Sequence, residues 1–490
     1  MIDPGQLPIL IVIIPLFGAL AVSLAGCCLS KRWCLPLTVL ALAGSGWAAL
    51  ATLNQVIARG PISYRLGGWP PPMGIEYVVD HLNGLVLVVI TVVALLAAVS
   101  SKRSVEAEMP NRINLYYPLY LLLVTGLLGM TITGDAFNLY VLLEISALTT
   151  YALIAVGRPR ALHAGFNYLI LGTIGASLYL LGTGHLYIMT GSLNMADLAV
   201  ILPDLYTSPA VLVGFILIMV GIWTKMAFFP LHTWLPNSYT YAPDATSCLI
   251  APLMTKVSVY IMLRVMFTLF TPAYVFDHLT VAAPIVWLAV AGIVGGSLLA
   301  LAQKDFKKML TYLIVAEVGY MVGGAWLANR YGITGAILHI LNDALMTLCL
   351  FLAAAAIIHK IGGRKLEDLK GIFHRMPLTM AAFMVGALSM IGVPPTAGFF
   401  SKWYLILGGI EAGRWEFVAA LLFSSLVNAV IFFRIVEIGF FEKAENGKVA
   451  EAPLSMLVPL LLAAASLIVI GIYSGDIVTT VIRHAVPEGI

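Results

Sequence analysis

The chain has 490 residues, of which 61% are hydrophobic and 10% are charged, against roughly 25% charged residues in an average soluble domain. This lack of charge and a mean hydropathy of +0.98 exclude an ordinary water-soluble enzyme. The formal net charge of +3 is too small to indicate nucleic-acid binding, and no basic run could follow a phosphate backbone. Length and composition therefore predict an all-α protein that crosses a membrane many times.

The five cysteines lie in apolar stretches, without a Cys-x-x-Cys pair or a histidine at the spacing of a metal site. We therefore expect buried, small apolar side chains rather than disulfides or cluster ligands. Residues 24–27 (Leu-Ala-Gly-Cys) resemble a lipoprotein cleavage box, but no basic residue precedes the apolar run. Residues 7–29 are therefore interpreted as a retained first helix. The cysteines are Cys27, Cys28, Cys34, Cys248 and Cys349.

Apolar runs bounded by charges, proline or glycine predict fourteen membrane-spanning helices, because each crossing needs about 20 mostly apolar residues. The longest polar connection, residues 57–81, predicts a folded turn or a short hairpin. The predicted spans are residues 7–29, 33–56, 82–100, 114–133, 135–156, 161–190, 210–230, 246–271, 282–302, 309–327, 332–358, 377–410, 416–441 and 454–476.

The basic residues are divided unevenly between the two alternating sets of connections, with 17 in one set and five in the other. Because cytoplasmic loops carry the excess of Lys and Arg, the larger set marks the cytoplasmic side of a prokaryotic plasma membrane. An even number of spans then places both termini and the turn at 57–81 outside the cytoplasm. The larger set is Lys31, Arg32, Lys102, Arg103, Arg112, Arg158, Arg160, Lys304, Lys307, Lys308, Lys360, Arg364, Lys365, Lys370, Arg375, Lys443 and Lys448, and the smaller set is Arg59, Arg65, Arg330, Arg414 and Arg483.

Five Lys or Arg residues lie inside the apolar spans, and three acidic residues lie near span centres. Burying a charge in a membrane is costly, so such residues are functional candidates by default. Arg434 precedes Glu437 by three residues near the end of its span, and we interpret that pair as structural, while the role of Arg264 stays open. The eight residues are Glu144, Lys225, Lys256, Arg264, Glu317, Asp343, Lys402 and Arg434.

An acid and a lysine recur at matched places in the two halves of the chain. Glu144 and Lys225 are 81 residues apart in the fifth and seventh spans, and Glu317 and Lys402 are 85 residues apart in the tenth and twelfth. An offset of five spans turns the second copy upside down, as in inverted-repeat transporters. The predicted units are three helices in residues 1–113, repeats of five helices in 114–271 and 282–441, and a last helix in 454–490.

The two spans that carry these lysines are interrupted by proline. Pro230 follows Lys225 in the seventh span, and residues 394–395 (Pro-Pro) precede Lys402 in the twelfth. Proline removes a backbone donor and clashes with the preceding turn, so both helices are predicted to break near the middle of the membrane. Unwound backbone is tolerated there only where protein or water satisfies it. A broken helix beside a buried lysine therefore indicates a hydrated ion path.

Lysine and glutamate suit proton transfer in this setting because burial disfavours the charged form of each and a nearby opposite charge favours it. A small movement of a partner would switch a lysine between holding and releasing a proton. His232 and His339 need less perturbation to titrate near neutral pH. His339 shares a helix face with Asp343 and Thr347, and a helix–helix hydrogen bond is the structural alternative for His339 and Asp343.

Several motifs stand out together along the chain. They are residues 134–140 (Gly-Asp-Ala-Phe-Asn-Leu-Tyr) leading to Glu144, residues 225–236, residues 242–245 (Ala-Pro-Asp-Ala), Lys256, residues 394–402, residues 64–69, and residues 366–371 before Met376-Pro377. In combination they resemble the antiporter-like subunits of respiratory complex I. Within that superfamily the chain is most similar to the D subunit of Mrp-type cation/proton antiporters and its counterparts in membrane-bound hydrogenases.

The resemblance covers about residues 60–440 and implies fourteen helices with two inverted five-helix repeats. Each repeat would be a half-channel, and a hydrophilic axis would join them across the middle of the membrane. The resemblance implies that Glu144 tunes Lys225, that Lys256 connects the halves and that Lys402 is the terminal site. It also implies other membrane subunits as partners and no redox cofactor bound by this chain.

The chain departs from the family pattern in its second half. Many relatives have His where Asp343 stands and Lys where Thr347 stands, and the position of Glu317 is often uncharged or His. These differences change the electric field at the centre of that half, so its path is either rewired or carries Na⁺. Glu317 and Asp343 would then be Na⁺ ligands, since hard cations prefer oxygen.

These observations predict a subunit that translocates protons, or exchanges Na⁺ for H⁺, within a multi-subunit membrane complex. Two alternatives stay open, a non-conducting scaffold subunit and a quinone-linked oxidoreductase subunit. The chain itself would hold no catalytic redox site, while its complex could be an ion-translocating oxidoreductase of the NADH/quinone or hydrogenase type. The coupling ion, its direction and the energy source stay open. The predicted proton carriers are Glu144, Lys225, Lys256, Glu317 and Lys402, supported by His232, His339 and Asp343.

Overall fold

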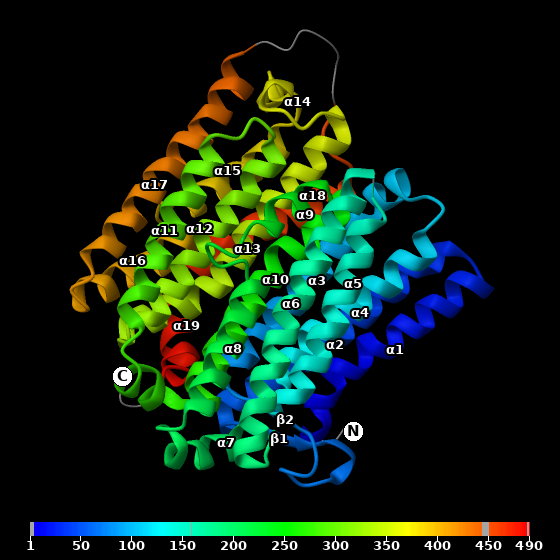
Figure 1. Cartoon of the computed structure of the whole chain (residues 1–490). Helices are drawn as coiled ribbons and strands as arrows, with labels where there is room; N and C mark the ends of the chain where they lie inside the picture. Colours follow the sequence, from blue (N-terminus) through cyan, green and yellow to red (C-terminus); the bar gives the residue numbers. More distant parts are fainter. Residues whose placement is uncertain (1–3, 158, 443–449, 488–489) are drawn as a thin grey trace.

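The computed structural model describes residues 4–157, 159–442, 450–487 and 490, and it is almost entirely helical apart from one small hairpin (Figure 1). The elements are α1 (Leu7–Cys28), α2 (Cys34–Arg59), β1 (Ile62–Arg65), β2 (Glu76–Val79), α3 (His81–Glu108), α4 (Ile113–Ile132), α5 (Ala136–Ala155), α6 (Pro159–Thr190), α7 (Met195–Ile201), α8 (Pro209–Lys225), α9 (Trp234–Tyr241), α10 (Asp244–Arg264), α11 (Ala282–Leu301), α12 (Phe306–Trp326), α13 (Arg330–Ile361), α14 (Ile372–Arg375), α15 (Pro377–Ile391), α16 (Ala397–Glu411), α17 (Trp415–Val436), α18 (Leu454–Ile472) and α19 (Ser474–Thr480). Turns of π-helix follow α10 at Val265–Leu269 and Ala273–His278, and α17 at Glu437–Phe441.

Twelve helices among the described residues are long and apolar enough to cross a membrane. Two shorter apolar helices, α8 and α15, add two passes, because each continues beyond a break as α9 or α16. The chain is therefore a multi-pass, all-α membrane protein with fourteen passes, as predicted. The third helix is longer than expected: α3 runs to Glu108 rather than ending near residue 100, because its charged last turns continue the helix past the apolar stretch.

Both predicted breaks are present, and local sequence explains each. α8 ends at Lys225, and Ala227 then adopts a φ of 58°, before Pro230 and the start of α9. α15 ends at Ile391 because Gly392 takes a φ of 95°, a left-handed conformation that favours glycine. The chain therefore leaves helical geometry within the membrane in both halves.

The connection at residues 57–81 forms the predicted hairpin, in which β1 and β2 pair antiparallel with Ile62 opposite Val79. Both chain ends lie on the same side of the molecule as this hairpin (Figure 1). The ring of His81, at the start of α3, lies 4.9 Å from the ring of His484 near the C-terminus. This common side agrees with an even number of passes.

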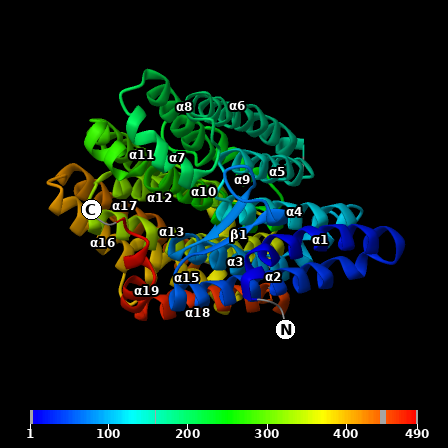
Figure 2. The ribbon, with the colours of Figure 1, turned by 90° about the horizontal axis from the view of Figure 1, so that it is seen from below.

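α10 and α13 form the interior of the bundle. The most apolar window of α10 is completely buried, and α13 is buried from Gly332 to Ile357. Figure 2 shows both helices toward the middle, with α6 and α8 at one edge and α16 and α17 at another. α6 and α8 pack through glycines, since a Cβ on Gly221 would lie 2.6 Å from the carbonyl oxygen of Gly175. Lys256 in the middle of α10 and Asp343 in the middle of α13 are therefore remote from lipid and bulk water.

Two expectations about side chains are wrong. Cys27 and Cys28 are exposed at the end of α1, where apolar side chains can face lipid, while the other three cysteines are buried. Arg434 and Glu437 are both exposed, and no ion pair joins them in the described part of the chain. Arg158, Lys443 and Lys448, counted above in the basic set, lie outside the described residues.

Candidate functional site

Lys225 lies in the last turn of α8, the first half of the first broken helix. The free carbonyl groups at this end of a helix stabilise a positive charge. Lys225 Nζ lies 3.8 Å from Glu144 Oε1 on α5 and 3.5 Å from the hydroxyl oxygen of Tyr151. The Lys225 side chain is 6% exposed, and Glu144 Oε1 has no hydrogen-bond partner. The carboxylate therefore acts on the lysine by its charge, without a hydrogen bond.

Aromatic residues that the sequence analysis did not single out line the Lys225 site. The Tyr151 ring meets the Tyr168 ring edge-on at 4.7 Å, and Tyr168 stacks on Trp234 at 3.8 Å. The indole of Trp234 donates a 3.0 Å hydrogen bond to the carbonyl oxygen of Thr224 at the end of α8. Tyrosine inside an apolar span is the signal that could have indicated these residues, because a buried hydroxyl needs a partner.

Lys256 on α10 forms an ion pair with Asp343 on α13 in the interior of the bundle. Lys256 Nζ lies 2.7 Å from Asp343 Oδ2, and the side chains are 1% and 0% exposed. The Thr347 hydroxyl donates a 2.9 Å hydrogen bond to Asp343 Oδ1 and lies 3.4 Å from Lys256 Nζ. The predicted connecting lysine is thus paired with Asp343, a carboxylate on the neighbouring helix.

Glu317 and His339 form a second buried pair, with 2.6 Å between Glu317 Oε2 and His339 Nε2. On its other side His339 Nδ1 lies 2.8 Å from the hydroxyl oxygen of Ser401, which lies 3.3 Å from the carbonyl oxygen of Gly398. In its neutral form, His339 can accept a hydrogen bond from the Ser401 hydroxyl at Nδ1. A protonated His339 can donate to Ser401, whose hydroxyl then donates to Gly398. Both protonation states therefore have hydrogen-bond partners.

Lys402 on α16 reaches back to the end of α15. Its Nζ donates to the carbonyl oxygens of Met390 at 2.6 Å and Ile391 at 3.5 Å, and to the Ser425 hydroxyl at 3.2 Å. It also lies 5.0 Å from the centre of the Tyr320 ring. In the described part of the chain, no carboxylate lies within 4.0 Å of this ammonium.

Two other buried basic residues have different environments. His232 stacks on Phe229 at 5.3 Å, and its Nδ1 has no hydrogen-bond partner, so the structure does not bring it into contact with the predicted carriers. Arg264 donates two hydrogen bonds to Asp80, at 2.6 and 2.9 Å. Burial alone would raise the pKa of Asp80, but the guanidinium outweighs it and holds that pKa below its usual value. Arg264 therefore ties α10 to the start of α3.

The two predicted Na⁺ ligands have separate partners, since Asp343 faces the Lys256 ammonium and Glu317 faces His339. Among the residues that the structure describes, no three His, Cys, Asp or Glu side chains group as metal ligands. A Na⁺ site at these carboxylates stays a prediction, and the ammonium on Asp343 competes with it.

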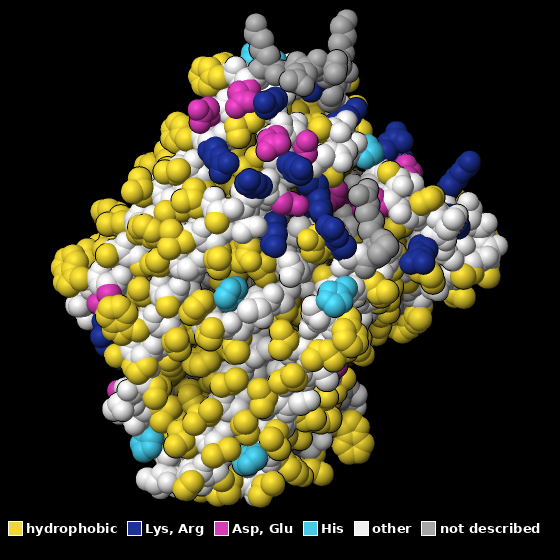
Figure 3. All heavy atoms as spheres, turned by 45° about the horizontal axis from the view of Figure 1, so that its top comes forward, with side chains coloured by type: hydrophobic (Ala, Val, Ile, Leu, Met, Phe, Trp, Pro, Cys, Tyr) yellow, Lys and Arg dark blue, Asp and Glu magenta, His cyan; other side chains and the backbone are white. Residues whose placement is uncertain are grey.

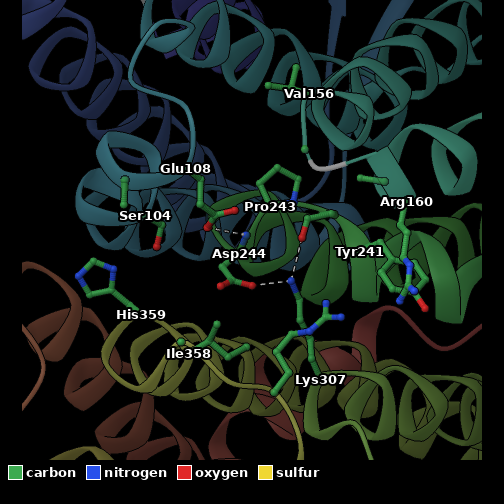
Figure 4. A pocket seen from close by; sticks show the side chains of 16 residues that line it. Ser104, Glu108, Val156, Arg160, Tyr241, Pro243, Asp244, Lys307, Ile358 and His359 are labelled. Atoms are coloured by element: carbon green, nitrogen blue, oxygen red, sulfur yellow. Dashed lines mark hydrogen bonds and ion pairs between the residues drawn. The ribbon is translucent and has the colours of Figure 1, made fainter. Parts of the chain in front are cut away.

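A pocket of about 990 Å³ (Figure 4) lies at the opposite end of α3 from the hairpin, because Ser104 and Glu108 in the last turns of α3 line it. Lys307 crosses it from α12 to form a 2.6 Å ion pair with Asp244 Oδ1 and a 2.9 Å hydrogen bond to the carbonyl oxygen of Ala242. The carboxylate of Glu108 accepts from the backbone N–H of Asp244 at 3.3 Å. The sequence analysis counted Lys307 only as a loop charge and Asp244 only as part of a motif.

A family model described as NADH:quinone oxidoreductase/Mrp antiporter, TM matches residues 133–428. This range covers more than half of the chain and includes every predicted carrier from Glu144 to Lys402. The chain belongs to the NADH:quinone oxidoreductase/Mrp antiporter family. The family predicted from the motifs is therefore confirmed.

Curated relatives in the NADH:quinone oxidoreductase/Mrp antiporter family carry two kinds of name. The N subunit of the NADH-quinone oxidoreductase of Desulforudis audaxviator is 45% identical over 509 aligned positions, covering 99% of each chain. The D subunit of the Na(+)/H(+) antiporter of Bacillus subtilis is 31% identical over 398, covering 81% of this chain and 80% of the relative. Both redox-linked and antiporter complexes are thus represented among the relatives.

Two solved structures share the whole fold. A chain of the archaeal membrane-bound sulfane sulfur reductase complex is 32% identical, with a TM-score of 0.89, over 98% of this chain and 96% of its own. A chain of the Mrp complex from Dietzia sp. has the same TM-score and coverage at 24% identity, which supports the fold alone. The fold of the NADH:quinone oxidoreductase/Mrp antiporter family therefore extends beyond the region matched by the family model.

Proposed function

We propose that this chain is a proton-translocating, antiporter-like subunit of a multi-subunit membrane complex. The observation that carries the proposal is a series of ionisable groups inside membrane helices, half-buried on α5 and buried on α8, α10, α13, α12 and α16. The proposed carriers are Glu144, Lys225, Lys256, Glu317 and Lys402, with His232, His339 and Asp343 in support.

The buried pair of Lys256 and Asp343 is the strongest support for this role. Replacing a buried ion pair by apolar residues of similar volume is often neutral or stabilising, so stability alone does not explain its presence. Ionisable groups within membrane helices typically mark ion pathways. With a partner at 2.7 Å, a small displacement of either side chain would change which one holds the proton.

The proposed organisation is two inverted five-helix repeats, residues 114–271 and 282–441, flanked by residues 1–113 and 454–490. Each unit has one broken helix that carries a buried lysine, and one acid on an earlier helix, and this match supports the division. An inverted pair would place its two sites near the middle of the membrane, as in other transporters built from repeats.

The proposed partners are further membrane subunits, since relatives and solved neighbours are named as subunits or chains of larger complexes. No cofactor is assigned to this chain, and any redox reaction would belong to other subunits. A scaffold subunit or a quinone-binding oxidoreductase subunit are the alternatives.

The test is Lys225→Ala in inside-out vesicles that hold the assembled complex, with proton movement followed by an acridine dye after NADH or a Na⁺ pulse. We expect transport to fall by about 100-fold or more, the scale of a positioned proton-transfer group. The exposed Lys102→Ala is the matched control. Transport by Lys225→Ala at the wild-type rate would refute the proposal.

The same vesicles separate the alternatives. A scaffold role predicts that neutralising Glu144 and Lys402 lowers complex assembly and transport in parallel, whereas a proton path predicts lost transport in a complex that still assembles. Labelling of this chain by a photo-reactive quinone would support the oxidoreductase alternative.

We further propose that the basic side is cytoplasmic in a prokaryotic plasma membrane and that both termini lie outside. Lys and Arg gather at the end of the molecule that carries α14 (Figure 3), and cytoplasmic loops carry this excess. Met73, in the hairpin loop, is 90% exposed. A Met73→Cys variant should react with an impermeant maleimide in whole cells, and labelling only in inside-out vesicles would reverse the orientation.

A further inference from the structure

The pocket shown in Figure 4 lies at the ends of the helices that build the Lys225 site. Its wall includes Val156, directly after α5, Ala161 in the first turn of α6, and Tyr241, the last residue of α9. α5 carries Glu144 and Tyr151, and the segment before α9 leads back to Lys225. The side chains between the pocket wall and Lys225 therefore form the layer that separates the pocket from this site.

Three buried tyrosines occupy that layer. Tyr151 is five residues from Val156 on the same helix, about 7.5 Å along the axis, and Tyr168 is seven residues from Ala161, about 10 Å. Tyr239 is two residues from Tyr241 on the pocket wall. The three side chains are 5%, 0% and 0% exposed.

The three rings form a continuous aromatic group through Trp234. Tyr151 contacts Tyr168, Tyr168 stacks on Trp234, and Trp234 meets Tyr239 edge-on at 6.0 Å. At the inner end of this group, the Tyr151 hydroxyl lies 3.5 Å from Lys225 Nζ.

The hydroxyls are not explained by packing. Those of Tyr168 and Tyr239 are buried and have no hydrogen-bond partner in the protein, and phenylalanine would stack equally well without that cost. Gly172 on α6 leaves room for the hydroxyl of Tyr151, because a Cβ at this position would overlap the Tyr151 hydroxyl oxygen. Buried polar groups of this kind are typically satisfied by internal water.

We propose that the hydroxyls of Tyr239, Tyr168 and Tyr151, together with water, relay protons between the pocket and Lys225. This inference rests on the proposed function and names the route to its first lysine. A protonated water in the pocket supplies the proton and is left as neutral water. Each hydroxyl oxygen then takes a proton from the water or hydroxyl on its pocket side while its own proton passes to the next oxygen. Tyr151 gives its proton to the neutral Lys225 amine, which becomes an ammonium, so every phenol ends neutral. Release runs in the opposite direction.

The test uses the assembled complex in the vesicles described above, with the variants Tyr151→Phe, Tyr168→Phe and Tyr239→Phe. Each removes one oxygen and keeps the ring. We expect transport to fall about 100-fold for Tyr151→Phe and at least about tenfold for the other two, where water can bridge part of the gap. Gly172→Ala should reproduce the Tyr151 effect by displacing its hydroxyl.

The matched control is Tyr274→Phe, which removes another buried, unpartnered hydroxyl, in the turn Ala273–His278 away from the pocket. It should transport at the wild-type rate. The ratio of rates in H₂O and D₂O separates relay from packing: it should rise in the three relay variants, because proton transfer becomes limiting, and a packing defect would leave it unchanged.

The outcomes distinguish this inference from the proposed function. If Lys225→Ala abolishes transport while all three phenylalanine variants transport normally, only the relay is refuted. Lower rates with an unchanged isotope ratio would also refute it. If Lys225→Ala transports normally, the proposed function itself fails.

Discussion

Lys225 and Lys402 occupy matched places in the two halves but are held in different ways. Lys225 faces a carboxylate, Glu144, at 3.8 Å and a phenol at 3.5 Å. Lys402 has no such acid within 4.0 Å in the described part of the chain, and donates instead to two carbonyl oxygens at the end of α15 and to Ser425. The matched acid of the second half, Glu317, faces His339.

The difference shows that two lysines at matched places in the sequence can have different interactions. A mobile carboxylate can approach or leave Lys225 and so change its charge, whereas the helix carbonyls beside Lys402 belong to the backbone and stay in place. We therefore expect the charge of Lys402 to be controlled through the pair of Glu317 and His339. We expect the first lysine to be the more sensitive to loss of its neighbouring acid.

The largest effect is expected where the halves meet, at Lys256 and Asp343. Lys256→Met leaves the charge of Asp343 buried without an opposite charge, with only the hydrogen bond from Thr347, which should lower the free energy of unfolding by about 3–5 kcal/mol and abolish transport. Denaturation of the purified complex in detergent measures the free energy of unfolding, and the vesicle assay measures transport. If Lys225 and Lys402 lie on one proton path, this single change stops proton transfer through both sites.

The double variant Lys256→Met/Asp343→Leu is the control for stability. It removes both charges together, so the free energy of unfolding should return close to the wild-type value. Transport should stay lost, because no titratable group then connects α10 to α13. A double variant that transports at the wild-type rate would show that the two halves work independently.

Glu144→Gln and Glu317→Gln test the comparison directly. Glu144 makes no hydrogen bond through Oε1, so Glu144→Gln removes mainly the charge. Because an ion pair near 4 Å is worth up to about 4 kcal/mol, this variant should lower transport by more than about tenfold. Its thermal stability should change little. Glu317→Gln replaces a charge-assisted bond in a fully buried pair, so it should also lower stability, by about 1–3 kcal/mol.

The readouts are the melting temperature of the assembled complex and the transport rate of each variant. Equal melting temperatures for the two glutamine variants would contradict the asymmetry. A normal transport rate in Glu144→Gln would mean that Lys225 does not depend on its acid.

Much of this arrangement could be predicted from sequence because it depends on local rules. Proline and apolar periodicity located fourteen passes and both breaks, and charge in an apolar span marked Lys256 and Asp343. Pairing could not be predicted, since residues such as Glu317 and His339 meet only when separate helices pack. Tyr168 was missed for the same reason: a tyrosine in an apolar span resembles ordinary core until its hydroxyl is found without a partner.

The smallest expected effect concerns Ser425, the one side chain that donates or accepts a hydrogen bond with Lys402 in the described structure. Ser425→Ala leaves the bonds to Met390 and Ile391 in place and removes about 1 kcal/mol of interaction with the ammonium, so transport should fall only a few-fold. Ser466→Ala, which removes a hydroxyl bonded only to its own helix, is the matched control. Measured rates that equal the control would assign Lys402 wholly to the carbonyl end of α15. A loss as large as that of Glu144→Gln would instead make Ser425 the counterpart of Glu144, and the two halves would then be alike in how they hold their lysines.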